Sequence, residues 1–112
     1  MFFFTDLLIN YFFVNYFCMV ITTLESIVKE KKWKTLQGAY RNLAKTSKNR
    51  PSESFLIQSL DNPSLWRIIS IWKDMETLQK VRESGKTPTG ILIFREAGAE
   101  PTLTIFDVKG IL

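Results

Sequence analysis

The chain has 112 residues, of which 46% are apolar and 23% charged, and its formal net charge is +4. A chain of this length fits one compact domain, and the composition excludes a disordered protein, which has fewer apolar residues and more net charge. The sequence contains no histidine and one cysteine, Cys18, which excludes an intrachain disulfide and removes the two commonest transition-metal ligands. We therefore expect a cytoplasmic protein without a metal site.

Residues 1–18 differ in composition from the rest of the chain, because they hold six of the nine phenylalanines and one charged side chain, Asp6. A secretory signal is excluded, since the segment lacks a basic start. A membrane anchor stays open, although Asp6, Asn10 and Asn15 interrupt the apolar run. The favoured interpretation is that Met19 is the native start and that residues 1–18 are a non-domain hydrophobic extension from a wrongly assigned start site.

The first two elements of the domain follow residue 19. Residues 20–28 are rich in β-branched side chains and alternate between two faces, which predicts a strand. From residue 30 to 44, apolar side chains recur at spacings of three and four, which predicts a helix with one apolar face. These apolar side chains are Trp33, Leu36, Tyr40 and Leu43. The polar segment 46–52 ends the helix and contains Pro51, which predicts a loop.

A β-hairpin is predicted over residues 53–73. Residues 54–60 alternate in polarity, and residues 61–64 (Asp-Asn-Pro-Ser) are four consecutive turn formers before a second strand begins at Leu65. Asp74 then follows as a helix N-cap, since its carboxylate can accept a hydrogen bond from a backbone N–H of the first turn.

The last third of the chain begins with a helix that carries Met75, Leu78 and Val81 inward and ends near Gly85. Residues 86–90 form a turn. The run 91–97 fits either a strand or a short helix, and residues 98–101 interrupt it. Residues 102–108 alternate strongly, which predicts a final strand with apolar groups on both faces.

This order of elements predicts one α+β domain over residues 19–112. A βαββαβ chain forms the ferredoxin-like fold, a four-stranded antiparallel sheet with the helices on one face. The opposite face of such a sheet is bare. Because both faces of the final strand carry apolar side chains, the bare face needs a partner to cover it.

Two segments carry a resemblance to a known family. They are Trp66-Arg67-Ile68-Ile69-Ser70-Ile71-Trp72-Lys73-Asp74 and Phe94-Arg95-Glu96-Ala97-Gly98-Ala99-Glu100-Pro101-Thr102-Leu103-Thr104-Ile105-Phe106-Asp107-Val108. With a helix between them, these segments resemble the antibiotic biosynthesis monooxygenase (ABM) domain family. The resemblance covers residues 19–109. It implies that the run 91–97 is a short helix, and that two copies of the chain pair through their sheets into a dimeric α+β barrel.

The resemblance also implies a function and candidate site residues. ABM-like proteins include monooxygenases that act on a small aromatic or quinol-like compound without a bound cofactor, and the protein supplies orientation, desolvation and hydrogen bonds. No catalytic residue is assigned, and the candidates are for substrate binding. These candidates are Tyr40, Gln58, Trp66, Arg67, Ser70, Trp72, Arg95 and Phe106.

The alternative is that the aromatic candidates only pack and that the arginines are surface charges. The chain would then be a non-catalytic dimeric module that binds a small molecule or serves as a structural unit. A membrane-tethered version that uses residues 1–18 is a third hypothesis.

Lysines and arginines cluster between residues 29 and 50. Clustered basic side chains can bind the phosphates of nucleic acids. No nucleic-acid-binding motif or pattern of exposed aromatic side chains accompanies them, so the favoured interpretation is a solvated helix face. We therefore expect no nucleic-acid partner.

Overall fold

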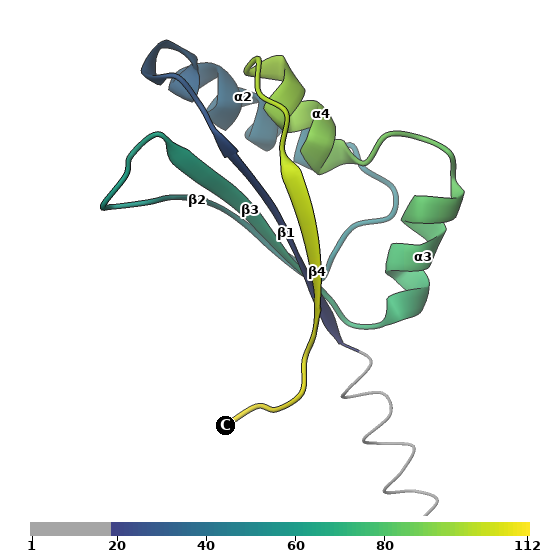
Figure 1. Cartoon of the computed structure of the whole chain (residues 1–112). Helices are drawn as coiled ribbons and strands as arrows, with labels where there is room; N and C mark the ends of the chain where they lie inside the picture. The colour runs from purple at the N-terminus through teal and green to yellow at the C-terminus, as the bar shows by residue number, and fades with distance from the viewer. Residues whose placement is uncertain (1–18) are drawn as a thin grey trace, which may run out of the picture.

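The computed structural model describes residues 19–112 (Figure 1). The predictions for residues 1–18, including those for Cys18, lie outside the described residues. The predicted order of elements is confirmed, and residues 91–96 of the run 91–97 are helical, as part of α4. The elements are β1 (Val20–Ile27), the 3₁₀ helix η1 (Glu30–Lys32), α2 (Trp33–Ala44), β2 (Glu53–Gln58), β3 (Leu65–Trp72), α3 (Met75–Glu83), α4 (Thr89–Glu96) and β4 (Thr102–Asp107).

The four strands form one antiparallel sheet in the order β2-β3-β1-β4. This is the predicted ferredoxin-like arrangement, in which the first and third strands are central. In the register of β1 and β3, Leu24 is opposite Ile68, Thr22 is opposite Ser70, and Val20 is opposite Trp72. All six side chains are buried on the face that the helices cover (Figure 1).

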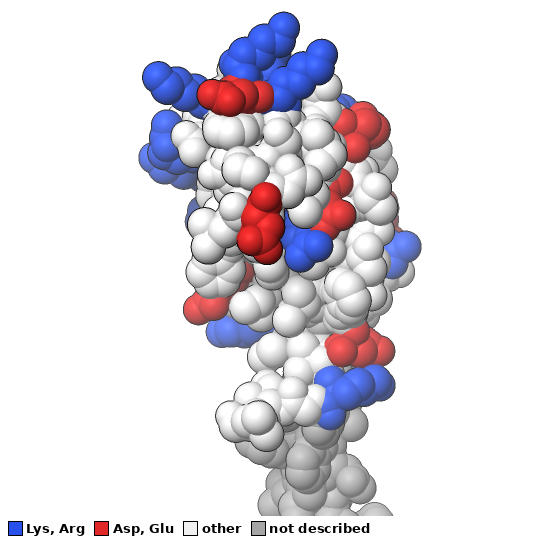
Figure 2. All heavy atoms as spheres, turned by 60° about the vertical axis from the view of Figure 1, so that its left-hand side comes forward, with Lys and Arg blue, Asp and Glu red and all other residues white. Residues whose placement is uncertain are grey.

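The opposite face of the sheet carries the alternate residues and has no helix over it. Its apolar side chains include Phe55, Ile57 and Phe106, which are 48%, 39% and 50% exposed. Arg67 and Glu25 form an ion pair on the same face, between β3 and β1. Figure 2 brings this side of the molecule forward and shows it largely uncharged, with basic side chains gathered at the end that carries η1.

Most of the core lies under α2 and α4, which pack against each other at one end of the sheet. We call this group of buried residues the main cluster. It consists of Leu24, Val28, Leu36, Trp66, Ile68, Ile93, Phe94 and Ala97. A second, smaller group lies at the other end of the sheet, under α3, and we call it the small cluster. It consists of Val20, Trp72 and Leu78.

Local interactions fix where the helices begin and end. Asp74 is the predicted N-cap of α3, since its Oδ1 accepts hydrogen bonds from the Thr77 backbone N–H at 2.8 Å and from the Thr77 hydroxyl at 3.0 Å. Gly98 follows α4 with a φ of +72°, a left-handed conformation that glycine adopts without strain. No helix within residues 19–112 has the length and apolar character needed to cross a membrane.

Candidate functional site

A cavity of about 480 Å³ lies on the helix-covered face of the sheet, between the main cluster and the small cluster. Its floor is formed by β1, β3 and β4, and its walls come from α2, α3, the start of α4 and the loop before β2. The volume lies within the usual range for small-molecule sites, which are mostly apolar with a few placed polar groups. We therefore take this cavity as the candidate site.

The floor of the cavity carries two buried hydroxyl groups side by side. Thr22 on β1 is opposite Ser70 on β3, and both line the cavity. Thr22 Oγ1 accepts a hydrogen bond of 3.0 Å from the indole N–H of Trp72. The Ser70 hydroxyl makes no hydrogen bond with any residue between 19 and 112, although Ser70 is only 9% exposed. Ser70 is therefore free to bond with a ligand.

One wall is formed by α2 and the loop that follows it. The Tyr40 hydroxyl donates a hydrogen bond of 2.9 Å to Ser54 Oγ, which joins α2 to the edge strand β2. The loop is fixed at its end by Ser52, because both its backbone N–H and its hydroxyl donate to the carbonyl of Ile71 at 2.8 Å. This loop forms the rim of the cavity and contributes Arg50 to it.

The opposite wall is formed by α3 and the start of α4. Leu78 and Val81 of α3 line the cavity, and so do residues 88–91. Gly90 lies against the sheet, since a Cβ atom added to it would overlap Leu24 Cδ1 and would be 3.9 Å from Ile68 Cδ1. A residue without a side chain lets the backbone of α4 approach the floor this closely.

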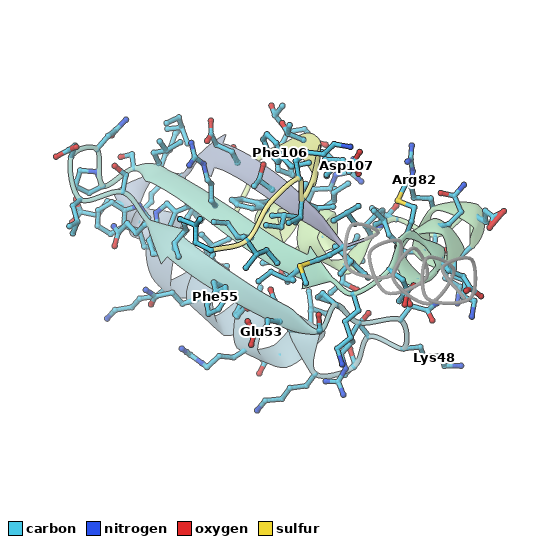
Figure 3. All side chains as sticks on the ribbon, turned by 90° about the horizontal axis from the view of Figure 1, so that it is seen from below. Lys48, Glu53, Phe55, Arg82, Phe106 and Asp107 are labelled. Atoms are coloured by element: carbon cyan, nitrogen blue, oxygen red, sulfur yellow. The ribbon has the colours of Figure 1, made fainter. Side chains whose placement is uncertain are left out.

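The charged residues that line the cavity are Arg50, Glu53 and Arg82. None of them forms an ion pair within residues 19–112. Glu53 pairs with Ile71, which belongs to the opposite face of the sheet, so its side chain is on that face. Figure 3 shows Arg82 at the outer edge of the molecule. The inner part of the cavity therefore holds hydroxyl groups, an indole and apolar side chains, without a carboxylate.

Ionisable groups with a shifted pKa lie outside the cavity. Hydrogen bonds from Thr77 lower the pKa of Asp74 at the start of α3. On the outer surface, Arg95 donates hydrogen bonds to Glu100, which raises the pKa of Arg95 and lowers that of Glu100. In the part of the chain that the structure describes, no three acidic or cysteine residues come together as a metal site.

The cavity brings together three of the residues proposed from the sequence, Tyr40, Ser70 and Trp72. Two further candidates lie on the opposite face of the sheet. Arg67 is paired there with Glu25, and Phe106 is half exposed on the edge strand β4. Figure 3 labels Phe106 and shows it at the other edge of the sheet from Phe55.

The remaining three candidates are held by other contacts. Gln58 donates a hydrogen bond of 2.8 Å to the Pro63 carbonyl and closes the hairpin loop. Trp66 is 3% exposed in the main cluster, with its ring 6.0 Å from that of Trp33. Its indole N–H is buried and has no partner among the described residues. Arg95 is paired with Glu100 outside the cavity.

Thr22, Arg50 and the start of α4 also line the cavity but were not among the site residues predicted from the sequence. The alternation of β1 placed Thr22 on the face shared with Val20 and Leu24, which is a usable signal for Thr22. The segment 86–90 was interpreted only as a turn, and nothing in its local pattern indicates which part of the sheet it approaches.

Comparison with protein-family models found no match, and no curated protein matches the sequence. Solved structures do match in fold. A conserved protein from Methanosarcina mazei has a TM-score of 0.65 and 20% identity, over 88% of this chain and 99% of that one. SnoaB from Streptomyces nogalater, a cofactor-independent oxygenase, has a TM-score of 0.62 and 13% identity, over 84% and 96% of the two chains.

A third solved structure is from Nitrosomonas europaea and is provisionally named an antibiotic biosynthesis monooxygenase. It has a TM-score of 0.62 and 17% identity, over 82% of this chain and 91% of that one. The chain thus has the α+β ferredoxin-like fold of proteins with that name. At these identities the likeness concerns the fold.

Proposed function

We propose that the chain is a small homodimeric monooxygenase that binds an aromatic or quinol-like compound in the cavity and oxidises it with O₂, without a bound cofactor. The observation that carries the proposal is the cavity itself, about 480 Å³ in volume, with an apolar interior and a few hydroxyl groups. The shared fold with a structure described as a cofactor-independent oxygenase supports it.

In such a reaction the protein needs no redox group of its own. An electron-rich substrate supplies the electrons, one oxygen atom of O₂ enters the substrate, and the other leaves as water. The protein binds the substrate, excludes water and hydrogen-bonds to the oxygen that becomes anionic. In this cavity the Ser70 hydroxyl is available for such a bond, Trp72 supplies an aromatic wall, and Tyr40, whose hydroxyl donates to Ser54, borders the substrate. The candidate binding residues for this function are therefore Tyr40, Ser70 and Trp72.

The face of the sheet that the helices leave bare supports the proposed homodimer. Phe55, Ile57 and Phe106 are exposed there, together with partly exposed isoleucines of β1 and β3. A second copy placed face to face would bury both sets of side chains, and apolar area removed from water contributes roughly 25 cal/mol per Å². The proposed interface does not include the cavity, which lies on the other face.

The dimer is tested by adding a charge to the bare face. We expect Phe106→Asp to convert a dimer into a monomer, because an unpaired carboxylate would be buried at the interface. The control is Leu92→Asp, which adds the same charge at a 41% exposed position on α4. Light scattering after size-exclusion chromatography measures the mass. A dimeric Phe106→Asp variant, or a monomeric wild-type chain, would contradict the proposal.

The alternative function is ligand binding without catalysis. The absence of any carboxylate directed into the cavity among residues 19–112 favours it, since no general base other than a hydroxyl group is available. The two functions are separated by mixing the full chain with simple quinols without oxygen, measuring binding by tryptophan fluorescence, and then admitting ¹⁸O₂. We expect one ¹⁸O atom per product molecule. Binding with no uptake of ¹⁸O above the protein-free rate would favour the binding module.

A further inference from the structure

The first residues of α4 have unbonded backbone N–H groups and lie beside the cavity. The N-cap residue Pro88 has no side chain that can accept a hydrogen bond, and none caps the helix. No atom within residues 19–112 accepts a hydrogen bond from the N–H of Thr89 or Gly90, and both residues line the cavity. The N-terminus of a helix also carries a partial positive charge. A ligand oxygen with negative charge suits this position.

Ser70 is a second and independent indication of a ligand in the same cavity. It lies on β3, two residues along the same face from Ile68, whose Cδ1 is the atom 3.9 Å from a Cβ built on Gly90. It is 9% exposed and its hydroxyl has no partner among the described residues. The Ser70 oxygen is not one of the fully enclosed, unbonded polar atoms, so it opens to the cavity, where a ligand can supply the hydrogen bond that such hydroxyl groups normally make.

Two further hydroxyl groups of the inner cavity already take part in hydrogen bonds. Thr22 accepts from Trp72, and Tyr40 donates to Ser54. On the floor and at the start of α4, the groups without a partner among the described residues include two backbone N–H donors and the Ser70 hydroxyl, which can also donate. Arg50 and Arg82 add positive charge at the rim, while Glu53 belongs to the opposite face. The free hydrogen-bonding groups and the charge favour an anion over a neutral ligand.

We infer that the start of α4 and Ser70 form an anion site that binds the ionised hydroxyl group of a phenol or quinol. The inference rests on the proposed function, because it assumes that an aromatic compound enters the cavity. Binding the anion in preference to the neutral form releases the hydroxyl proton to solvent. The bound compound is then more electron-rich than the free one, which is the state that reacts with O₂.

The residue Gly90 fits this role. A side chain at this position would meet the tip of the Leu24 side chain, so that Leu24 or the start of α4 would have to shift. With glycine, the backbone at residue 90 lies directly against Leu24 of β1 and Ile68 of β3, which line the floor of the cavity. The glycine therefore lets the N-terminus of α4 come close to the ligand, as in other anion sites at helix N-termini.

The experiment uses 4-nitrophenol, whose ionised form absorbs visible light, with the full chain. Titration with protein at several pH values gives the pKa of the bound phenol. We expect this pKa to be lower than that of free 4-nitrophenol, because the site prefers the anion. The variant Thr89→Pro removes one N–H and is expected to weaken binding of the anion about tenfold, as for a hydrogen bond to a charged group.

The position of Thr89 makes this variant suitable. Proline is tolerated at the first residue of a helix, where the N–H has no partner within the helix. Pro88 has φ −56° and ψ 143°, the extended conformation that a residue before proline requires. The matched control is Thr89→Ala, which removes the side chain and keeps the N–H. Ser70→Ala tests the hydroxyl group separately and carries the test if Thr89→Pro does not fold.

The outcomes separate the two proposals. A lowered pKa that returns toward the free value in Thr89→Pro or Ser70→Ala, and not in Thr89→Ala, supports the anion site. If 4-nitrophenol binds and its pKa is unchanged or raised, the anion site is wrong and the aromatic-binding cavity stands. Equal effects of Thr89→Pro and Thr89→Ala also overturn the role of the N–H. If neither 4-nitrophenol nor any simple quinol binds, the proposed function itself fails.

Discussion

The two ends of the helix-covered face differ in how completely side chains fill them. Under α2 and α4, Leu36 and Phe94 have no exposed surface, and eight residues form one buried cluster. Under α3 the buried group has three members, and the cavity adjoins it. The difference follows from helix packing. Helix α2 packs against α4, whereas α3 stands apart from both and contacts mainly β3 (Figure 1).

This comparison separates residues that hold the fold together from residues that leave room for a ligand. Protein interiors are normally packed as densely as organic crystals, so an unfilled space of several hundred Å³ reduces stability and is retained where a ligand occupies it. We call the end of the sheet under α2 and α4 the filled end, and the end under α3 the hollow end. Substitutions at the hollow end should reduce stability less than the same kind of substitution at the filled end.

The largest difference is expected between two leucines truncated in the same way. Leu36→Ala at the filled end should lower the free energy of unfolding by about 3–5 kcal/mol, because its surroundings cannot collapse into the space. Leu78→Ala at the hollow end should cost less, about 2–3 kcal/mol, since Leu78 already borders the cavity and has fewer partners to lose. Urea denaturation at one protein concentration measures both, because a dimer links stability to concentration.

Equal losses for the two variants would mean that the hollow end is packed as tightly as the filled end in solution. That result would count against the cavity as a binding site. A larger loss at Leu78 would place the main source of stability under α3.

Enlarging a side chain should give the opposite pattern. Ala97→Leu at the filled end forces extra atoms into a packed site and should cost about 1–3 kcal/mol. Ser70→Leu at the hollow end places the same side chain into the cavity, so the free energy of unfolding should stay within about 1 kcal/mol of the parent value. The same variant should abolish binding of quinols, measured by tryptophan fluorescence. Unchanged binding in Ser70→Leu would show that the ligand site lies elsewhere.

Sequence patterns predicted the filled end better than the hollow end. The spacing of Leu36 and Tyr40 defines an apolar helix face, and the alternation of β3 defines two strand faces; both follow from local geometry. The fold was therefore predictable, element by element. A cavity depends on which apolar faces fail to meet, and this depends on how far α3 stands from α2 and α4. No local pattern records that distance.

The candidate site residues likewise divide into those that local patterns predict and those that depend on tertiary packing. Ser70 and Trp72 were predicted from the strand that carries them, and the structure places both at the cavity. Arg67 is adjacent to Trp66 in the sequence but lies on the other face of the sheet, since neighbours in a strand point in opposite directions. The N–H groups of residues 89 and 90 were not predicted, because a backbone donor has no side-chain signature and becomes a site only through tertiary packing.

The smallest effect is expected at the boundary of α3, the helix that covers the hollow end. Asp74→Ala removes the N-cap and should lower the free energy of unfolding by about 1 kcal/mol at neutral pH. The hydrogen bonds from Thr77 lower the pKa of Asp74 in the folded state. A group of this kind stabilises the fold above its unfolded pKa, and the contribution is lost as the pH falls below about 4 toward the lower folded-state value.

The difference between Asp74→Ala and the parent chain should therefore be largest at pH 6–7 and should shrink in acid, as measured by urea denaturation at a series of pH values. The control is Asp61→Ala, which removes an exposed aspartate in the hairpin loop and should change stability by less than about 0.5 kcal/mol. Because α3 carries Leu78 and Val81 to the cavity, Asp74→Ala should also weaken ligand binding, whereas Asp61→Ala should not. A cap variant that loses stability and keeps full binding would show that the ligand is held by the sheet and α4 alone, with α3 only a cover.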